Sequence, residues 1–145
     1  MVHSETVAIP LQKYSAARIA EARQAMGGIG GKEIPFLKQV EAYKIMDLQL
    51  RGETLTAEVQ VFKIGADTAI VALPGEIFCE LGMLIRQRSP FRNTMIVELA
   101  NDSIGYVPTL RAFKEGSYEV VNSRVEAGGG EKLVETAARL LQSFR

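Results

Sequence analysis

The sequence predicts a single α/β domain with some α+β character, in which helices flank a mixed sheet of about five strands. The first observation behind this prediction is an alternation of apolar and polar residues over 46–61, interrupted by a turn at Gly52-Glu53. A second tight turn, Gly65-Ala66-Asp67, leads into an apolar run at Thr68–Leu73. Three successive strands joined by short turns indicate an antiparallel meander.

The second observation is a helix between two apolar strands. Residues 77–85 carry apolar side chains at helical spacing, between the run Thr68–Leu73 and a strand expected at Thr94–Leu99. A helix that links neighbouring strands favours a right-handed crossover and parallel pairing, so a β-α-β crossover follows the meander. Pro74-Gly75 ends the first of these strands, and Glu76 follows at once. Glu76 is therefore expected where the carboxyl end of the sheet meets the start of a helix, a common place for ligand-binding and catalytic groups.

The remaining elements are predicted from apolar spacing and from start and stop signals. A short extended piece is expected at Val7–Tyr14, and Ser15 can cap the helix that follows it. The glycine-rich segment 27–31 ends that helix. Lys32 follows it, but a phosphate-binding loop would need Gly at position 26 and Ser or Thr at position 33, where the sequence has Met26 and Glu33. A helix stop is therefore favoured over a nucleotide site. Helices are expected at Ala16–Met26, Pro35–Lys44, Leu110–Lys114 and Glu131–Phe144. One face of the second contains Phe36, Leu37, Val40 and Tyr43, and the inward face of the last contains Leu133, Val134, Ala137, Leu140 and Leu141.

The composition is that of an ordinary globular domain, with 47% apolar and 23% charged residues in a chain of 145. Seventeen basic residues balance seventeen acidic ones, so nothing favours a nucleic acid or an anionic membrane surface as partner. No apolar run approaches the roughly 20 residues that a transmembrane helix needs, and the polar amino terminus has no apolar signal-peptide core. A soluble chain is therefore expected.

The sequence contains one cysteine, Cys79, and one histidine, His3. A disulfide within the chain and a cysteine-based metal cage are excluded, and no Ser-His-Asp or Cys-His arrangement can be assembled. Catalytic zinc sites commonly use two or more imidazoles, which this chain does not supply. His3 is expected in a frayed end. Cys79 is expected to be a small buried residue rather than a nucleophile, because no histidine accompanies it.

Several positions have both a structural and a functional interpretation. Glu76 in the first turn of a helix would be favoured by the helix dipole alone, by about 0.3–1 kcal/mol. Tyr106 and Tyr118 could each be a half-buried aromatic residue whose hydroxyl finds a backbone partner. Gly128–Gly130 could bind an anion through backbone amides before a helix, but a loose loop is the simpler interpretation.

Four short motifs occur in order between residues 73 and 119: Leu-Pro-Gly-Glu-Ile-Phe (73–78), Asn101, Gly-Tyr-Val-Pro-Thr (105–109) and Tyr-Glu (118–119). With them the chain resembles the neutral/alkaline, non-lysosomal ceramidase family, from about residue 65 to residue 119. In that family a Pro-Gly-Glu precedes a helix. An Asn-x-Tyr-x-x-Tyr segment follows, and a Tyr-Glu comes twelve residues after its second tyrosine. Here Tyr118 lies twelve residues after Tyr106.

The resemblance implies an activity, a cofactor and residue roles. The family hydrolyses the amide bond of N-acyl sphingosine with a zinc-bound water, so a lipid amide is the implied substrate. By the match, Glu76 and Tyr106 correspond to zinc ligands, and Tyr118 corresponds to a tyrosine that stabilises the oxyanion at the scissile carbonyl. A carboxylate is a normal zinc ligand, and a phenol can donate a hydrogen bond to a developing oxyanion.

The chain also departs from the family pattern. The two zinc histidines of the family precede the Pro-Gly-Glu, and nothing before Glu76 supplies that pair. We therefore expect residues 1–145 to be one domain that is a fragment of a larger ceramidase-like catalytic domain, with zinc in the complete domain and no activity in this chain alone. Such a fragment should expose apolar surface, so we expect either homo-oligomers or an adhesive apolar face. The alternative is a non-catalytic α/β module for binding or self-association.

Overall fold

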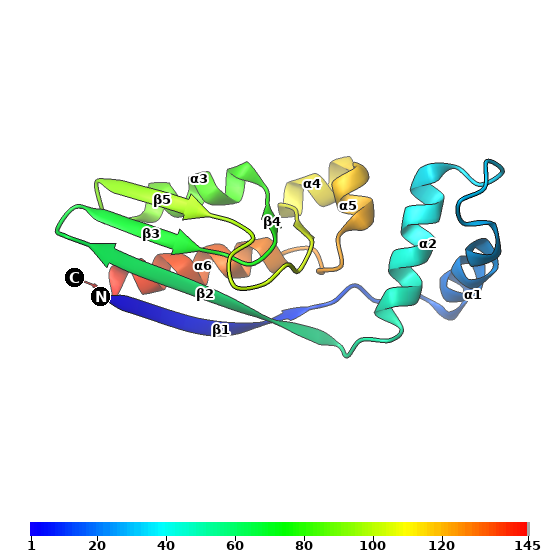
Figure 1. Cartoon of the computed structure of the whole chain (residues 1–145), viewed down its shortest axis with the longest axis horizontal. Helices are drawn as coiled ribbons and strands as arrows, with labels where there is room; N and C mark the ends of the chain where they lie inside the picture. Colours follow the sequence, from blue (N-terminus) through cyan, green and yellow to red (C-terminus); the bar gives the residue numbers. More distant parts are fainter. Residues whose placement is uncertain (145) are drawn as a thin grey trace.

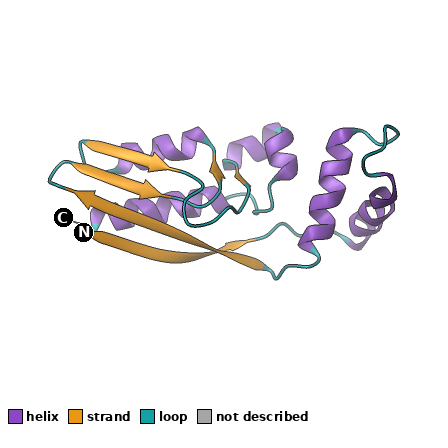
Figure 2. Ribbon diagram, viewed as in Figure 1, coloured by secondary structure: helices purple, strands orange, loops and turns teal. Residues whose placement is uncertain are grey.

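A computed structural model describes residues 1–144 and shows a four-stranded sheet with helices on one face (Figures 1 and 2). The strand order is β1 (Val2–Pro10), β2 (Thr54–Ile64), β3 (Thr68–Ala72) and β5 (Asn93–Val97). The first three strands pair antiparallel, and β5 pairs parallel to β3. The prediction of an α/β fold with a mixed sheet is therefore confirmed, and so is the parallel crossover.

A second, two-stranded sheet lies beyond the end of β3. It consists of β4 (Glu76–Ile77) and β6 (Tyr106–Val107), which pair parallel to each other. The described residues thus form six strands in two sheets rather than about five in one. Two-residue strands carry no period-two pattern, because a period needs at least four residues to show.

The prediction was wrong about the first strand of the meander. Residues 46–48 belong to α2 (Phe36–Leu48), whose buried positions Ala42, Ile45 and Leu48 follow helical spacing. Its place in the sheet is taken by β1, which starts well before the extended piece expected at 7–14. The alternating exposure along β1 shows that its polar amino terminus still follows the period of a half-buried strand.

His3 is not in a frayed end. Its ring stacks on Phe144 with the centroids 4.0 Å apart, and its Nδ1 lies 2.6 Å from the Ser143 hydroxyl. Both partners lie at the carboxyl end of the last helix, α6 (Gly129–Gln142), or just beyond it. The first and last segments of the described chain therefore meet, as Figure 1 shows.

The predicted helices are present. Ser15 caps the first by accepting a hydrogen bond from the Arg18 amide at 3.3 Å, and a short 3₁₀ turn within the glycine-rich segment ends it. None of the described helices is both long enough and apolar enough to cross a membrane. The other helices and turns are α1 (Ala16–Ala25), the 3₁₀ turn η1 (Met26–Gly28), α3 (Cys79–Arg88), α4 (Leu110–Glu115) and α5 (Tyr118–Asn122).

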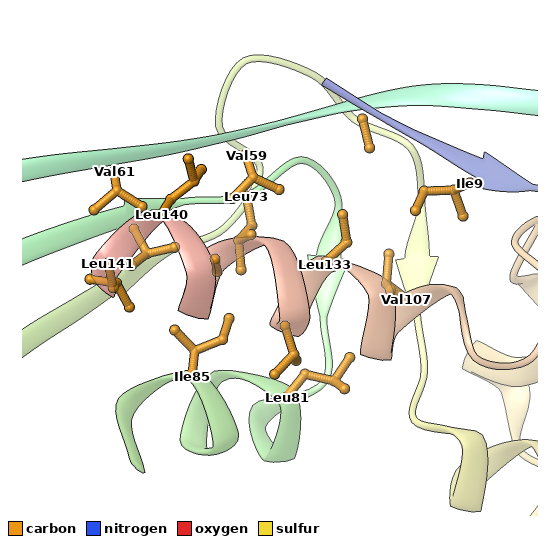
Figure 3. Close-up of a cluster of buried hydrophobic side chains, with 14 of the residues drawn as sticks. Ile9, Val59, Val61, Leu73, Leu81, Ile85, Val107, Leu133, Leu140 and Leu141 are labelled. Carbon is orange, nitrogen blue, oxygen red and sulfur yellow. The ribbon is translucent and has the colours of Figure 1, made fainter. Parts of the chain in front are cut away.

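The main core lies between the sheet and α6, with α3 beside it (Figure 3). All five residues predicted to face inward from α6 are buried, none more than 8% exposed. They pack against alternate residues of β2 and β3 and against Leu81 and Ile85 of α3. This core holds the end of β3, and hence Glu76, in a fixed position.

The α1–α2 hairpin projects from the end of the long β1–β2 ribbon and has a small core of its own (Figure 1). Ala22, Ala42 and Ile45 form that core. The apolar face predicted for α2 is largely exposed: Phe36 is 65% exposed and Tyr43 57%. The residues that α2 buries lie next to that face instead, and they are Ala42, Lys44, Ile45 and Leu48.

The face of the sheet opposite α6 is open and partly apolar. The strand register places Val2, Phe62, Ile70 and Met95 in one row across all four strands. Val2 is 51% and Met95 56% exposed. Exposed apolar surface is therefore present, as expected.

Candidate active-site residues

The turn after β3 sets the position of Glu76. Gly75 has φ +89°, and a Cβ at this residue would lie 2.6 Å from the Gly105 carbonyl oxygen. Only glycine allows this close approach of two backbone segments. The Glu76 amide then donates to Gly105 at 2.9 Å.

Glu76 lies in β4, and α3 starts at Cys79. The first-turn interpretation of Glu76, in which the helix dipole alone explains the acid, is therefore wrong. The predicted strand end at Pro74-Gly75 is correct, because β3 stops at Ala72.

Glu76 and Tyr106 lie directly opposite each other. They are register partners in the β4–β6 ladder, and both are half-buried. The Glu76 carboxylate is the main cause of a raised pKa of Tyr106, with desolvation second. The neighbouring carboxylate therefore disfavours ionisation of the phenol.

Tyr118 completes an aromatic row next to this pair. It is the first residue of α5, where Ser117 accepts a hydrogen bond from the Val120 amide at 3.4 Å. Its ring meets Tyr106 edge-on with the centroids 5.9 Å apart, and stacks on Phe36 at 6.0 Å. The three residues selected by the resemblance, 76, 106 and 118, therefore form one cluster.

The carboxyl edge of the sheet brings further polar groups to the same region. Asn101, with φ +70°, follows β5 and donates through Nδ2 to the Gln60 side chain at 3.1 Å. Glu98 accepts a hydrogen bond from the Ile77 amide at 2.7 Å, and so supports the strand that carries Glu76. In the sequence, Glu98 stands out only as the one polar residue in the apolar run 95–99.

A chain of partly buried hydrogen bonds holds the backbone of Tyr106 in place. The Ser123 hydroxyl donates to the Tyr106 carbonyl at 2.9 Å. Gln12 Nε2 donates to the Ser123 carbonyl at 2.8 Å and to Val125 at 3.1 Å. Sequence reasoning missed both Gln12 and Ser123, because a side chain that bonds to a distant backbone leaves no local pattern.

The described residues do not complete a zinc site. Glu76 and Tyr106 offer two oxygen donors, whereas a catalytic site needs three protein ligands. The described part of the chain contains no group of three or more His, Cys, Asp or Glu side chains that could hold a metal ion. His3, the one histidine of the sequence, contacts the carboxyl end of α6, whereas Val107, the neighbour of Tyr106, lies near Gly130 at the amino end of α6. Thirteen residues of helix, about 20 Å, separate these two ends, so His3 does not lie beside Tyr106.

Two other interpretations need correction. Cys79 is exposed rather than buried, and its pKa is raised by a hydrogen bond to Glu80, so a thiolate is disfavoured. Gly129 and Gly130 are not a loose loop. They are the buried first residues of α6, where a Cβ on Gly130 would lie 2.5 Å from Leu81 and 3.0 Å from the Pro108 carbonyl oxygen.

Comparison with known proteins gives structural matches only. No protein-family model and no curated protein matches the sequence. A ceramidase complexed with C2 has a TM-score of 0.58 and 16% identity, with 83% of this chain and 21% of that chain covered. The neutral ceramidase from Pseudomonas aeruginosa has a TM-score of 0.54 and 15% identity, with 99% of this chain and 29% of that chain covered. The chain is therefore similar in fold to a segment that makes up less than a third of the length of each of these proteins.

Proposed function

We propose that this chain forms part of the active site of a ceramidase-like zinc amidohydrolase. The observation that carries the proposal is the pairing of Glu76 with Tyr106 in β4–β6, with the Tyr118 ring against Tyr106. These residues are more than 40 positions apart at the extremes, yet the fold gathers all three. The similarity of the fold to neutral ceramidase supports the same assignment.

Each residue has a role that its position suits. Glu76 and Tyr106 would contribute oxygen donors to the zinc of the complete domain, and zinc would there activate water and polarise the carbonyl. Tyr118 would donate a hydrogen bond to the oxyanion of the amide carbonyl. The remaining ligands would come from polypeptide outside residues 1–145, so this chain alone is expected to be inactive.

The surroundings of the cluster suit a lipid amide. The exposed ring of Phe36 continues the aromatic row from Tyr118, and Leu37 beside it is 45% exposed. A groove lined by Phe78, Ala112 and Ser117 opens between the start of α3 and the α4–α5 turn. Glu80, Glu115 and Glu119 also line this groove, so the exposed aromatic row rather than the groove is the apolar surface that an acyl or sphingoid chain would contact.

A chimera tests this proposal. Residues 1–145 replace the matching segment of the Pseudomonas aeruginosa neutral ceramidase, so that the remainder of that enzyme supplies the missing ligands. Zinc content and hydrolysis of a short-chain N-acylsphingosine are then measured. We expect Glu76→Gln and Tyr106→Phe to lose zinc and activity. Tyr118→Phe should keep zinc and lose rate by about 10²–10³-fold, as removal of an oxyanion donor does.

The matched control is Glu126→Gln, which changes an exposed acid in the segment between α5 and α6, outside the cluster and the groove. It should leave zinc content and rate unchanged. A chimera that folds, binds zinc and shows no hydrolysis would contradict the proposal. So would an active chimera that is indifferent to Glu76→Gln.

A second function is favoured by the open face of the sheet. Its apolar row across β1, β2, β3 and β5 suits a non-catalytic module for binding or self-association. In that case Glu76→Gln should leave fold and association unchanged in this chain.

A further inference from the structure

The free edge of β5 offers backbone groups for pairing. Val97 accepts from the Leu73 amide at 2.9 Å and Asn93 donates to Asp67 at 2.9 Å, so the odd-numbered residues of β5 direct their backbone groups toward the sheet. Thr94 and Ile96 therefore direct theirs outward, because successive strand residues alternate. No backbone hydrogen bond joins those outward groups to another residue within the described range.

This edge lacks the features that usually protect an edge strand. Asn93–Val97 contains no proline and no charged residue, and its register with β3 is continuous, without a bulge. Grooves lined by Met83 and Arg86 of α3 run beside it, so the edge is accessible. An accessible, regular edge strand is a template for another strand.

The charges at the two ends of β5 indicate which strand that is. Arg92 precedes the strand and Glu98 follows it, and both are exposed. In an antiparallel pair of two identical strands centred on Met95, Thr94 lies opposite Ile96, and Arg92 lies opposite Glu98. We propose that two copies of this chain dimerise through β5 in this register, which joins two four-stranded sheets into one of eight strands.

The register satisfies two requirements at once. The outward backbone groups of Thr94 and Ile96 exchange hydrogen bonds, as a directly opposed antiparallel pair does. Both symmetry-related Arg92–Glu98 pairs bring opposite charges together across the strands. Pairing centred on Thr94 or Ile96 instead would place Arg92 or Glu98 opposite an uncharged residue. A two-fold axis at Met95 therefore uses the whole edge.

The same axis extends the apolar row of the open face. Met95 ends the row that starts at Val2, and at the axis it would meet Met95 of the second copy. The side chains of such a central pair without hydrogen bonds approach closely. Met95 is 56% exposed in the single chain, and this contact would reduce that exposure. The proposal concerns association only and does not depend on the amidohydrolase assignment.

Charge reversal provides the test. Sedimentation equilibrium of the whole chain, from micromolar to submillimolar concentration, should show a monomer–dimer equilibrium. Arg92→Glu should weaken it by about ten-fold or more, because it places like charges opposite one another twice. Glu98→Arg should do the same, although it also removes the acceptor of the Ile77 amide, so Arg92→Glu is the cleaner variant. An equimolar mixture of the two variants restores both attractive pairs, so native mass spectrometry should find a dimer with one copy of each.

A matched pair of lysine variants separates edge pairing from stacking of open faces. Met95→Lys places two like charges at the proposed axis and should weaken the dimer about ten-fold. Val2→Lys introduces the same charge in the same row, at the other edge of the sheet, and should leave the dimer unchanged. Amide exchange of Thr94 and Ile96 should slow as the protein concentration rises.

Several results would overturn the proposal. One is a monomer at every concentration. Another is a dimer that is insensitive to Arg92→Glu and Met95→Lys. Equal weakening by Val2→Lys would point to stacked open faces instead. Protection of Thr94 and Ile96 only after fusion to further polypeptide would assign the edge to a strand of a longer chain.

Discussion

At the residue before Glu76, glycine allows two backbone segments to approach each other closely. A Cβ on Gly75 would meet the Gly105 carbonyl, whereas a Cβ on Gly65, which is also at positive φ, would have no atom within 4 Å. The two residues therefore separate the cost of backbone conformation from the cost of a clash.

We predict that Gly75→Ala destabilises the chain by about 2–4 kcal/mol, because a left-handed conformation and a backbone overlap add together. Gly65→Ala, the matched control, should cost about 1 kcal/mol from conformation alone. Urea unfolding measures both values. Equal costs for the two variants would show that the β4–β6 contact can relax.

Lys44 is a buried cation, 3% exposed, that no carboxylate pairs with among the described ion pairs. Its ammonium donates to Gln12 at 3.3 Å and lies 5.2 Å from the centre of the Tyr14 ring. Burial lowers the pKa of Lys44 to about 8, and the charges of Arg124 and Arg18 add to this against the opposite effect of Glu41.

We predict that stability rises as the pH increases from about 8 to 10. The pKa of Lys44 is lower in the folded than in the unfolded chain, so between the two values the unfolded chain binds more protons and folding gains with pH. The gain should be about 2 kcal/mol. Above pH 10 it should fall again, because burial raises the pKa of Tyr14 to about 12.

Urea unfolding from about pH 7 to about pH 11 measures both the rise and the later fall. Lys44→Met should abolish the rise, whereas Lys38→Met, an exposed position on the same helix, should keep it. A rise that persists in Lys44→Met would assign it to another group.

At the residue scale the sequence motif found the cluster but not its geometry. Glu76, Tyr106 and Tyr118 were selected from their order and spacing. Their assembly depends on a two-residue ladder and on a ring contact, neither of which has a periodic signature. Gln12 and Ser123 could not be predicted from the sequence for the same reason, because their partners are backbone groups more than ten residues away.

At the scale of elements, an ion pair joins the α1–α2 hairpin to the main body, in addition to the stacking of Phe36 on Tyr118. Arg124 Nε donates to Asp47 at 2.6 Å, and both side chains are about one-fifth exposed, at 21% and 20%. Burial raises the pKa of Asp47, but hydrogen bonds from Arg51 and Arg124 outweigh it, and the pKa is lowered overall. The pair therefore contributes stability above pH 4 that is lost as the pH falls.

We predict that Asp47→Asn costs about 1–2 kcal/mol and speeds amide exchange in α1 and α2 more than in the sheet. Glu115→Gln is the control, because it removes the partner of Arg111 in a pair whose side chains are 85% and 57% exposed. Exchange measured by NMR at pH 7 distinguishes the two. A uniform change over the whole chain would show that the hairpin and sheet unfold together.

The end of α2 shows where element prediction failed. Leu48 fits an alternating pattern with Met46 and a helical pattern with Ile45, and so few residues do not decide between the two. In the structure Ala42, Ile45 and Leu48 are all buried at helical spacing, and the segment is a helix. The last helix was predicted correctly because its apolar face spans several turns.

At the scale of the molecule, the crossover from β3 through α3 to β5 was predictable because its parts adjoin in sequence. The pairing of β1 with β2 was not, because Val2 and Phe62 are partners across a long stretch of the chain and no local pattern links them. The open row of Val2, Phe62, Ile70 and Met95 likewise emerged only once that register was known. Exposed apolar surface was expected in general terms, but its location was not.

The contact of the first strand with the last helix has a consequence for how the chain folds. Gly129 at the start of α6 packs on Ile9, and Phe144 at its end packs on His3. Non-local topologies of this kind fold slowly, because long loops must close before their contacts form. At about 5–20 residues per second of synthesis, β1 would leave the ribosome many seconds before α6. During that interval its apolar side chains would depend on chaperones for protection.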